Sequence, residues 1–247
     1  MCVVTLPPPA RSALLLDVDG TLIDIAPTPD SVVVPPMLIP TLRQLRARLG
    51  GALALVSGRS VEVLDALLPD AAHAMAGEHG AAIRHAPGAA IERPDLPALP
   101  EAWLDKTSGL IAETPGAVME RKARGFTMHF RRCPEAGPRF HAFLQGLLAG
   151  QTRFRLLAGI MVWEVRPDGM DKGRAVDALM ARPPFAGRLP IFIGDDITDE
   201  DGMRAAQALG GTGLRVDTAF GSPAGVRAWL AASLNADTWP ETHDAAA

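Results

Sequence analysis

Residues 13–25, ALLLDVDGTLIDI, run from an apolar segment directly into two aspartates, a glycine and a threonine. Asp-Gly between two apolar runs is the strongest short signal for a β-hairpin, because glycine supplies the positive φ of a tight turn. A calcium loop of the EF-hand type is excluded, because Gly20 follows Asp19 directly and Thr28 occupies the position of the closing glutamate. This segment alone leaves two interpretations open, a structural turn and an active site at the end of a buried strand.

The rest of the chain alternates between helix-like and strand-like patterns. Leucines at spacings of four, three and four residues begin the series at Leu38, and prolines and glycines mark the ends of the elements. The patterns predict helices over residues 35–51, 60–69, 171–181 and 200–210, and strands over residues 52–56, 72–77, 189–194 and 212–216. Strands that alternate with helices are typical of an α/β fold with a parallel sheet.

The pattern changes between residues 84 and 166. A proline-rich junction leads into a predicted helix, a hairpin-like pair of strands, a second helix and two further strands, and Pro167 forms a return hinge. We therefore expect a catalytic core made of residues 1–83 and 167–247, with an inserted α+β cap domain made of residues 84–166. A chain of 247 residues is long enough for two such domains. We expect the tail after Leu234 to be frayed.

Polar residues follow three of the predicted core strands, at residues 17–21, 57–59 and 195–199. Because ligands bind outside the carboxyl ends of the strands in open parallel sheets, these side chains should meet at one edge, near Lys172 at the start of a helix. Carboxylates brought together repel one another unless a cation lies among them, and oxygen ligands select a hard ion such as Mg²⁺. One aspartate could then attack phosphorus, while the lysine and a hydroxyl neutralise and orient the phosphoryl oxygens.

Composition limits the class of partner. The net charge of −4, a pI near 5.9 and the lack of a Lys/Arg cluster on a predicted helix argue against nucleic acid or an anionic membrane, and favour a small-molecule substrate. The sequence has no run of about 18 apolar residues and no signal-peptide pattern. Cys2 and Cys133 are too far apart to indicate a zinc site or a disulfide framework. We expect a soluble protein in the reducing cytoplasm, and the sequence carries no signal for an oligomeric state.

Four motifs resemble, in order and spacing, those of the haloacid dehalogenase (HAD) superfamily of phosphatases: DVDGT, VSGR, the isolated lysine in DKGRAV, and GDDITDED. The resemblance implies a HAD-like Rossmannoid parallel-sheet core. It implies that Asp17 is the nucleophile, Asp19 the general acid/base and Lys172 the charge-neutralising lysine. The implied ligands of Mg²⁺ are Asp17, the backbone carbonyl of Asp19 and Asp195, with Asp196 and Asp199 in support. The implied substrate-binding residues of the core are Gly20, Thr21, Ser57, Gly58, Arg59 and His79.

The segments GEHGAAIR, MERKARGFTMHFRR and WEVRPDGMDKG resemble motifs of trehalose-6-phosphate phosphatases, whose pattern includes Glu-x-Lys, His-Tyr-Arg and Glu-[Val/Ile]-Arg-Pro. The resemblance covers nearly the whole chain, from Leu14 to about Leu230. It implies that the sugar is held by the cap residues Glu120, Lys122, Arg131 and Glu164. Phe130 replaces the tyrosine of the pattern, and the chain contains no tyrosine at all. A hydroxyl contact at that position is therefore absent.

Three of these positions also have structural interpretations. His79, in a Gly-Glu-His-Gly turn, could cap backbone groups rather than contact substrate. His129 alternates with its neighbours along a strand and could pack or form a local hydrogen bond. Glu120 and Lys122 share one face of a strand and could form a solvated ion pair.

We expect a Mg²⁺-dependent phosphoric monoester hydrolase of trehalose biosynthesis, which converts trehalose 6-phosphate to trehalose and inorganic phosphate through an aspartyl-phosphate intermediate. A phosphatase for another sugar phosphate, such as sucrose 6-phosphate or mannosyl-3-phosphoglycerate, is the alternative within the enzymes. A catalytically silent sugar-phosphate sensor is the alternative of another class, and the presence of Asp17, Asp19, Lys172 and Asp195 argues against it. A phosphomutase would need a bisphosphate activator.

Overall fold

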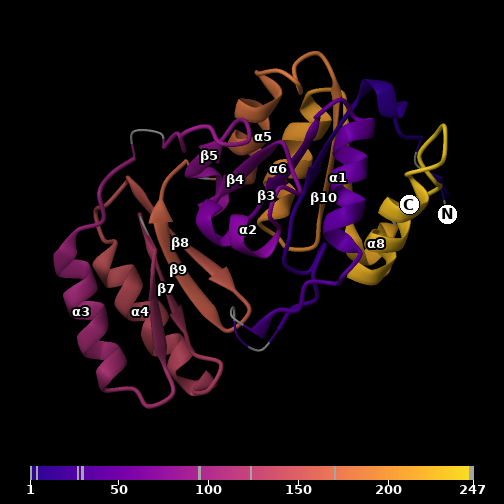
Figure 1. The fold of residues 1–247 in the computed structure, drawn as a ribbon. Coiled ribbons are helices and arrows are strands. Elements are labelled where there is room, and N and C mark those ends of the chain that lie inside the picture. The colour runs from indigo at the N-terminus through magenta and orange to yellow at the C-terminus, as the bar shows by residue number, and fades with distance from the viewer. Residues whose placement is uncertain are drawn as a thin grey trace. The chain divides into compact units, whose positions relative to one another are not determined.

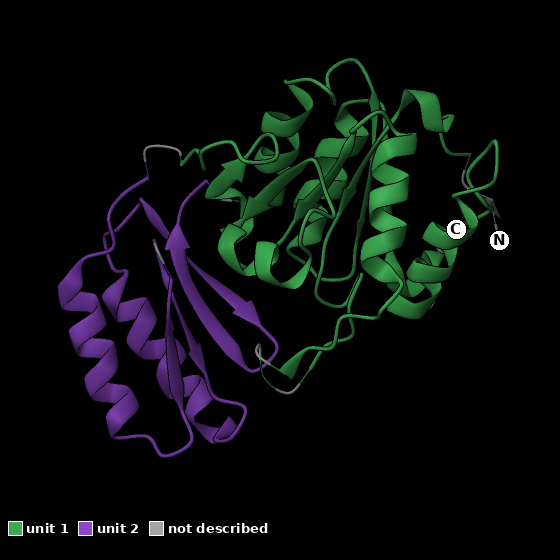
Figure 2. Cartoon of the chain, in the orientation of Figure 1, with its two compact units in different colours: residues 1–93, 171–247 green, residues 94–170 purple. Residues whose placement is uncertain are grey.

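The computed structural model describes residues 2–3, 5–26, 28, 31–93, 96–122, 124–169 and 171–244. The chain forms two compact units, one made of Met1–Arg93 with Asp171–Ala247 and the other of Pro94–Met170 (Figure 2). The division falls later in the sequence than the positions expected above, after residues 83 and 166. The reason at the first boundary is that residues 82–92 stay on the larger unit, where the backbone of Ile83 exchanges two hydrogen bonds with that of Glu92.

The larger unit contains a six-stranded sheet with β2 at its centre. The strand order is β11 (Thr212–Arg215), β10 (Leu189–Gly194), β2 (Ser12–Leu16), β3 (Leu53–Val56), β4 (Ala74–Gly77) and β5 (Ala82–Arg84). All neighbours are parallel except β4 and β5. Because both partners of β2 are parallel to it, the Asp-Gly sequence that follows β2 does not join a hairpin, and the hairpin interpretation is wrong.

Helices cover both faces of this sheet, which explains why its central strands are almost fully buried. The helices are α1 (Leu38–Arg48), α2 (Val61–Leu67), α5 (Lys172–Met180), α6 (Asp199–Ala208), α7 (Val216–Ala219) and α8 (Pro223–Ala232). In Figure 1, α1, α2 and α8 lie over one face, and α5 and α6 pack together on the other. Ser60 begins α2 as predicted, because its side chain accepts a hydrogen bond from the Val63 backbone N–H.

The smaller unit is an antiparallel sheet with two helices on one face. The strand order is β6 (Val118–Arg121), β7 (Phe126–His129), β9 (Val162–Pro167) and β8 (Phe154–Gly159), and the helices are α3 (Glu101–Ala112) and α4 (Gly137–Leu147). Alternate residues of the strands, including Phe126, Met128 and Val165, form an apolar cluster with the helices. The other set of alternate residues lies on the face that α3 and α4 leave uncovered.

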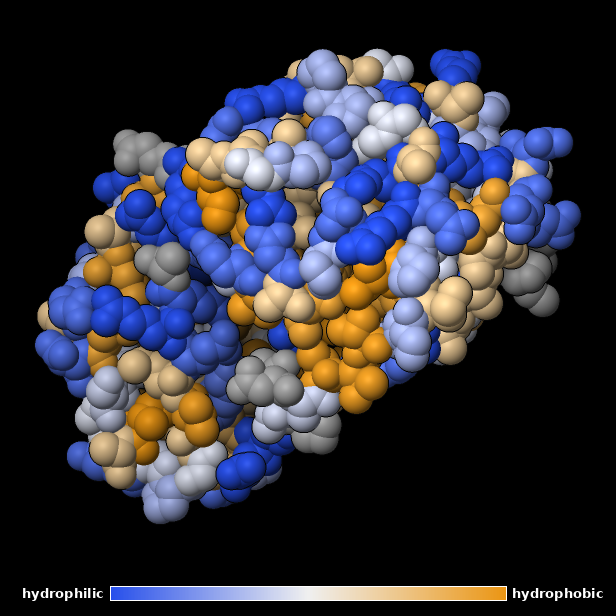
Figure 3. Space-filling model, in the orientation of Figure 1, coloured by the Kyte–Doolittle hydropathy of each residue, from blue (hydrophilic) through white to orange (hydrophobic). Residues whose placement is uncertain are grey.

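Short elements complete the described structure. They are the two-stranded sheet of β1 (Cys2–Val3) with β12 (His243–Asp244) and the 3₁₀ turns Pro9–Arg11, Glu78–Gly80 and Pro134–Ala136. None of the described helices has the length and apolar character needed to cross a membrane. Hydrophilic residues, blue in Figure 3, cover much of the visible surface of both units.

The expectation that the tail after Leu234 is frayed is wrong for its described residues. Trp239 is only 8% exposed, and its ring stacks on Trp229 with centroids 5.0 Å apart. The Trp239 indole N–H donates a hydrogen bond to Ser12 Oγ at the start of β2. The sequence signal was present in Trp239 itself, because a tryptophan in a terminal segment gains several kcal/mol when a core surface receives it.

Replacing Trp239 with Ala should lower the free energy of unfolding by about 3–5 kcal/mol, because it leaves a cavity against Trp229. Urea unfolding followed by circular dichroism measures the change. Trp239→Phe should lose less stability than Trp239→Ala, since it keeps an aromatic ring against Trp229 but loses the bond to Ser12 and part of the ring volume. A loss below about 1 kcal/mol for Trp239→Ala would contradict an anchored tail.

Candidate active site

The core residues expected at the site come from the carboxyl ends of three neighbouring strands. Asp17 directly follows β2, Ser57 follows β3, and Asp195 follows β10. Lys172 is the first residue of α5, whose N-cap Asp171 accepts a hydrogen bond from the Arg174 backbone N–H. The parallel register of the sheet therefore brings together groups that are more than 150 residues apart in the sequence.

A buried ammonium joins two carboxylates at the centre of the site. Lys172 Nζ lies 2.6 Å from Asp17 Oδ1 and 2.5 Å from Asp199 Oδ1. The Lys172 side chain is 3% exposed, Asp17 5% and Asp199 0%. Asp199 Oδ2 also accepts hydrogen bonds from the backbone N–H groups of Asp195 and Asp196. Asp199 thus holds both the lysine and the loop that carries Asp195.

Asp195 lies beside this pair. Thr21 Oγ1 is 3.2 Å from Asp17 Oδ2 and 3.1 Å from Asp195 Oδ1, so its hydroxyl can donate to either carboxylate. Gly20 has a φ of +78°, and a Cβ at this position would lie 2.1 Å from Asp195 Oδ2. Only glycine therefore lets the Asp195 carboxylate approach the backbone this closely.

The carboxylates carry more negative charge than Lys172 balances. Burial, followed by the charge of Asp199, raises the pKa of Asp17 well above its ordinary value, although Lys172 opposes the shift. Burial and Asp199 also raise the pKa of Asp195. Burial alone would lower the pKa of the Lys172 ammonium, but the charges of Asp17 and Asp199 outweigh it and raise that pKa. The lysine is therefore protonated, and the anionic excess lies on the aspartates.

The donor set fits a divalent cation. One oxygen from each of Asp17, Asp195 and Asp199 lies within 4.8 Å of the others. Hard oxygen ligands with an excess of negative charge are what Mg²⁺ requires of a protein site. The Asp196 side chain, also expected to support the metal, is outside this group of three. It is exposed, and its Oδ1 accepts a hydrogen bond from the Ile197 backbone N–H.

Asp19 is engaged by Arg59 rather than by the carboxylate cluster. Arg59 Nε and Nη2 donate to Asp19 Oδ2 and Oδ1 at 2.6 and 2.7 Å. The Arg59 backbone N–H donates to Ser57 Oγ at 3.2 Å, so the expected phosphate-binding serine and Arg59 belong to one short loop. Bidentate pairing of this kind fixes both side chains in orientation.

A left-handed turn supports that loop. Glu78 and His79 both have positive φ, 52° and 54°, although neither is glycine, and such conformations persist only where the surroundings impose them. Their backbone N–H groups donate to the carbonyl oxygens of Arg59 and Ser57. A Cβ on Gly58 would lie 2.7 Å from His79 Nε2, so the imidazole packs against the loop. The structural interpretation of His79 therefore agrees with its packing against Gly58. A contact between His79 and substrate stays a prediction.

The expected sugar-binding residues all lie on the smaller unit. Lys122 Nζ lies 3.0 Å from Glu164 Oε1, and Glu120 Oε2 lies 3.0 Å from His129 Nε2. His129 therefore forms the local hydrogen bond that the sequence allowed, and Lys122 forms an ion pair with Glu164. The hydrogen bond with His129 lowers the pKa of Glu120. Arg131 is exposed in the turn after β7.

Phe130, which stands where the family pattern has tyrosine, lies on the helix-covered face of the smaller sheet. Its ring packs edge-on against Phe140 and is stacked with Trp163. Phe130 is 8% exposed. The position is therefore filled by apolar packing, on the face opposite to Glu120 and Glu164.

Sequence reasoning gave too small a role to Asp199 and none to Glu78. Asp199 carried a usable signal, because it is four residues after Asp195, a spacing that brings a helix N-terminus back toward the preceding strand. Glu78 is 6% exposed and lies 3.2 Å from Arg93. Nothing in the local pattern separates the buried Glu78 from ordinary surface charges.

Comparison with known proteins decides the family. A sequence model described as trehalose-phosphatase matches residues 15–228, most of the chain. The chain belongs to the trehalose-phosphatase family. The trehalose-6-phosphate phosphatase of Escherichia coli (strain K12) is 38% identical to it over 85% of this chain and 79% of the relative. A probable trehalose-phosphate phosphatase of Sinorhizobium fredii is 40% identical over 83% of this chain and 77% of the relative.

Solved structures agree on the fold of the trehalose-phosphatase family. The C-terminal domain of the trehalose-6-phosphate phosphatase of C. albicans has a TM-score of 0.75 at 20% identity, covering 91% of this chain and 92% of that one. A haloacid dehalogenase-like hydrolase from Bacteroides thetaiotaomicron has a TM-score of 0.60 at 14% identity, covering 79% and 85%. The expected HAD-like core with a parallel sheet and a second α+β unit is confirmed.

The raised pKa of Asp195 predicts how stability depends on pH and metal. A carboxyl whose pKa is higher in the folded than in the unfolded protein binds more protons when folded, so stability falls as pH rises through that interval. In the presence of chelator, the Asp195→Asn variant should therefore lose less stability than wild type as the pH rises. Its melting temperature at pH 7.5 should equal or exceed that of wild type. Mg²⁺ should raise the melting temperature of wild type much more than that of Asp195→Asn.

Asp196→Asn is the matched control, because it removes an exposed carboxylate from the same loop. Its melting curve in chelator and its response to Mg²⁺ should follow wild type. An equal response to Mg²⁺ in Asp195→Asn and wild type would contradict the assignment of Asp195 to the cation site.

Proposed function

We propose that this chain hydrolyses trehalose 6-phosphate to trehalose and inorganic phosphate, as a step of trehalose biosynthesis, through an aspartyl-phosphate on Asp17. The observation that carries the proposal is the placement of Asp17 at the end of β2, with one oxygen on Lys172 and the other beside Thr21. Membership of the trehalose-phosphatase family supports the reaction and the substrate.

The first half-reaction uses Asp17 as the nucleophile. A carboxylate oxygen of Asp17 attacks phosphorus, the bond between phosphorus and the sugar oxygen breaks, and Asp19 gives its proton to that oxygen. Lys172, which already contacts Asp17, offsets the charge that spreads over the phosphoryl oxygens. The hydroxyls of Ser57 and Thr21, with Gly20, Gly58 and Arg59 around them, orient the phosphate.

The second half-reaction restores the enzyme. Asp19, now deprotonated, takes a proton from water as the water oxygen attacks phosphorus, and the bond to Asp17 breaks to release phosphate. Both Asp19 oxygens accept from Arg59 in the described state. Asp19 must therefore leave this ion pair before it can serve the sugar oxygen, and a substrate phosphate is a suitable new partner for the guanidinium.

Asp17, Asp195 and Asp199, with the Asp19 backbone carbonyl, would hold the divalent cation. When bound there, Mg²⁺ supplies positive charge that stabilises the phosphoryl oxygens as the bonds change. The excess of carboxylate charge in the cluster supports a cation of this kind.

The smaller unit is proposed as the cap that selects the sugar. Glu120, Lys122, Arg131 and Glu164 supply charged acceptors and donors, which suit the many hydroxyls of a disaccharide. Binding energy from groups far from phosphorus can be used to position it for attack. The cytoplasmic setting expected from the sequence stays a prediction; it is in keeping with Cys133, which is buried and free.

Asp17→Asn should abolish phosphate release from every substrate while the protein stays folded, because the amide keeps the shape of the side chain but is a far poorer nucleophile. Phosphate release from trehalose 6-phosphate and from p-nitrophenyl phosphate, with circular dichroism as the control for folding, measures this. A folded Asp17→Asn enzyme with normal turnover would contradict the covalent mechanism.

Substitutions in the cap should slow the hydrolysis of trehalose 6-phosphate but not that of p-nitrophenyl phosphate. Glu120→Ala and Arg131→Ala should each lower kcat/KM for trehalose 6-phosphate about a hundredfold or more, the scale expected for charged hydrogen bonds. Hydrolysis of p-nitrophenyl phosphate should be nearly unchanged, because this ester needs only the core. Glu113→Gln is the control, since it alters an exposed glutamate of the same unit. Equal losses on both substrates would instead mean that these residues stabilise the fold.

A further inference from the structure

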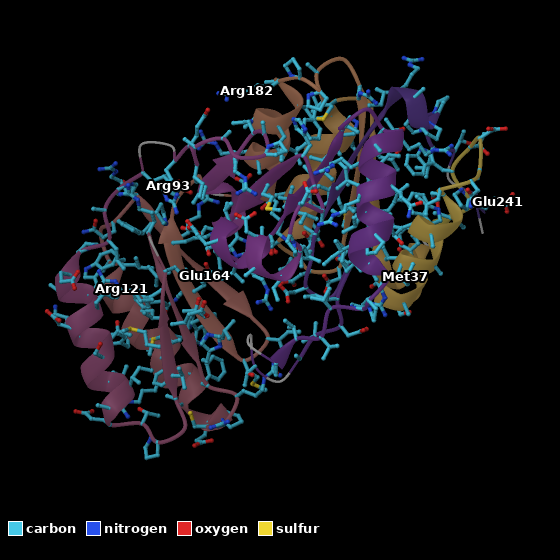
Figure 4. The ribbon with its side chains drawn as sticks, in the orientation of Figure 1. Met37, Arg93, Arg121, Glu164, Arg182 and Glu241 are labelled. Carbon is cyan, nitrogen blue, oxygen red and sulfur yellow. The ribbon has the colours of Figure 1, made fainter. Side chains whose placement is uncertain are left out.

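The uncovered face of the smaller sheet carries a row of directly opposed residues. The strand register aligns Glu120 on β6 with Thr127 on β7, and Thr127 with Glu164 on β9. Directly opposed residues of antiparallel strands point to the same face, so the threonine lies between the two glutamates. Figure 4 shows Glu164 on this sheet, on the side away from α3 and α4.

Each glutamate of the row is held from outside the row. Glu120 is bonded to His129, which lies two residues along β7 from Thr127, and Glu164 is bonded to Lys122. These contacts orient the two carboxylates, and neither of them involves the threonine. A ligand that reached the row would meet a hydroxyl flanked by two carboxylate acceptors.

The Thr127 hydroxyl has no hydrogen-bond partner among the described residues, and the side chain is only 3% exposed. A buried polar group without a partner is costly and uncommon in folded proteins, and a function is one of the reasons for which it is kept. Valine has almost the same shape and would suit a strand equally well. Packing and β-propensity therefore do not explain why this position has a hydroxyl.

The neighbouring position on the same face has no side chain. Gly125 is two residues before Thr127, and a Cβ there would lie 2.3 Å from the Val165 carbonyl oxygen. The backbone of β9 therefore approaches β7 closely beside the threonine, and the ion pair of Lys122 with Glu164 lies on the same face.

We propose that Thr127 is a specificity-determining residue, whose hydroxyl forms a hydrogen bond with a sugar hydroxyl of the substrate. The proposal rests on the function proposed above, and it adds a neutral contact to the charged ones. The proposal requires the side chains that bury Thr127 to move when the sugar enters, and Glu120, which lies directly opposite Thr127 and is half-exposed, is free to do so. The hydroxyl gains its partner only in the complex.

Thr127→Val tests the proposal, because it removes the hydroxyl and keeps the shape. We expect kcat/KM for trehalose 6-phosphate to fall about tenfold, with p-nitrophenyl phosphate within twofold of wild type. The melting temperature without substrate should stay the same or rise, since an unsatisfied buried group is removed. Thr127→Ser, which restores a hydroxyl, should recover most of the lost kcat/KM.

Thr107→Val is the matched control. Thr107 is also fully buried in this unit, but its hydroxyl donates to the Trp103 carbonyl oxygen within α3. This variant should lose stability and keep wild-type kinetics on both substrates. If Thr→Val lowers kcat/KM at position 127 but lowers stability at position 107, the Thr127 hydroxyl acts in substrate recognition and the Thr107 hydroxyl in folding.

Two results would overturn the inference while leaving the proposed function intact. One is a Thr127→Val enzyme with wild-type kcat/KM on trehalose 6-phosphate. The other is a lower melting temperature with equal losses on both substrates, which would show that the hydroxyl is structural. If the wild-type enzyme itself fails to hydrolyse trehalose 6-phosphate in the presence of Mg²⁺, the proposed function fails first.

Discussion

The contact of Lys172 with Asp17 and Asp199 is the interaction on which the site depends. It joins the end of β2 to the first residues of α5 and α6, three elements that no local sequence signal brings together. Removing Lys172 would leave two buried carboxylates facing each other without their counter-charge, so the ammonium holds the group together. The same contact leaves the cluster short of positive charge. This excess of carboxylate charge is what the proposed divalent cation would offset.

The sequence predicted the site best where the motif residues directly follow predicted strands. The ends of three parallel strands carried the motif residues, and parallel pairing of β10, β2 and β3 then required those residues to meet. It was less informative about which aspartate of DDITDED turns inward. Asp196 and Asp199 differ only in their place relative to the start of α6, and a shift of one residue in a helix start cannot be read from a pattern. The burial of Trp239 depended on a receiving surface near Ser12, which is more than 200 residues away in the sequence.

The two faces of the smaller sheet have different tasks, and the replacement at Phe130 shows how they are separated. Apolar rings on the face covered by α3 and α4 supply stability, so the loss of a tyrosine hydroxyl there leaves the opposite face unchanged. The uncovered face carries carboxylates, an ammonium, an imidazole and the Thr127 hydroxyl. If the proposed function holds, exchanges on this second face would alter which hydroxyl-rich ligand is preferred, at little cost to the fold.

The order of strands in the larger sheet has a consequence for synthesis of the protein on the ribosome. β10 lies between β2 and β11, so one edge of β2 has no partner until Leu189–Gly194 have been made. The smaller unit is contiguous in the sequence and can fold during this interval, whereas the larger one must wait for its second segment. An apolar strand edge is meanwhile open to pairing with other chains. The nascent chain is thus most exposed to aggregation, and to chaperones, just before Asp17 meets Asp195.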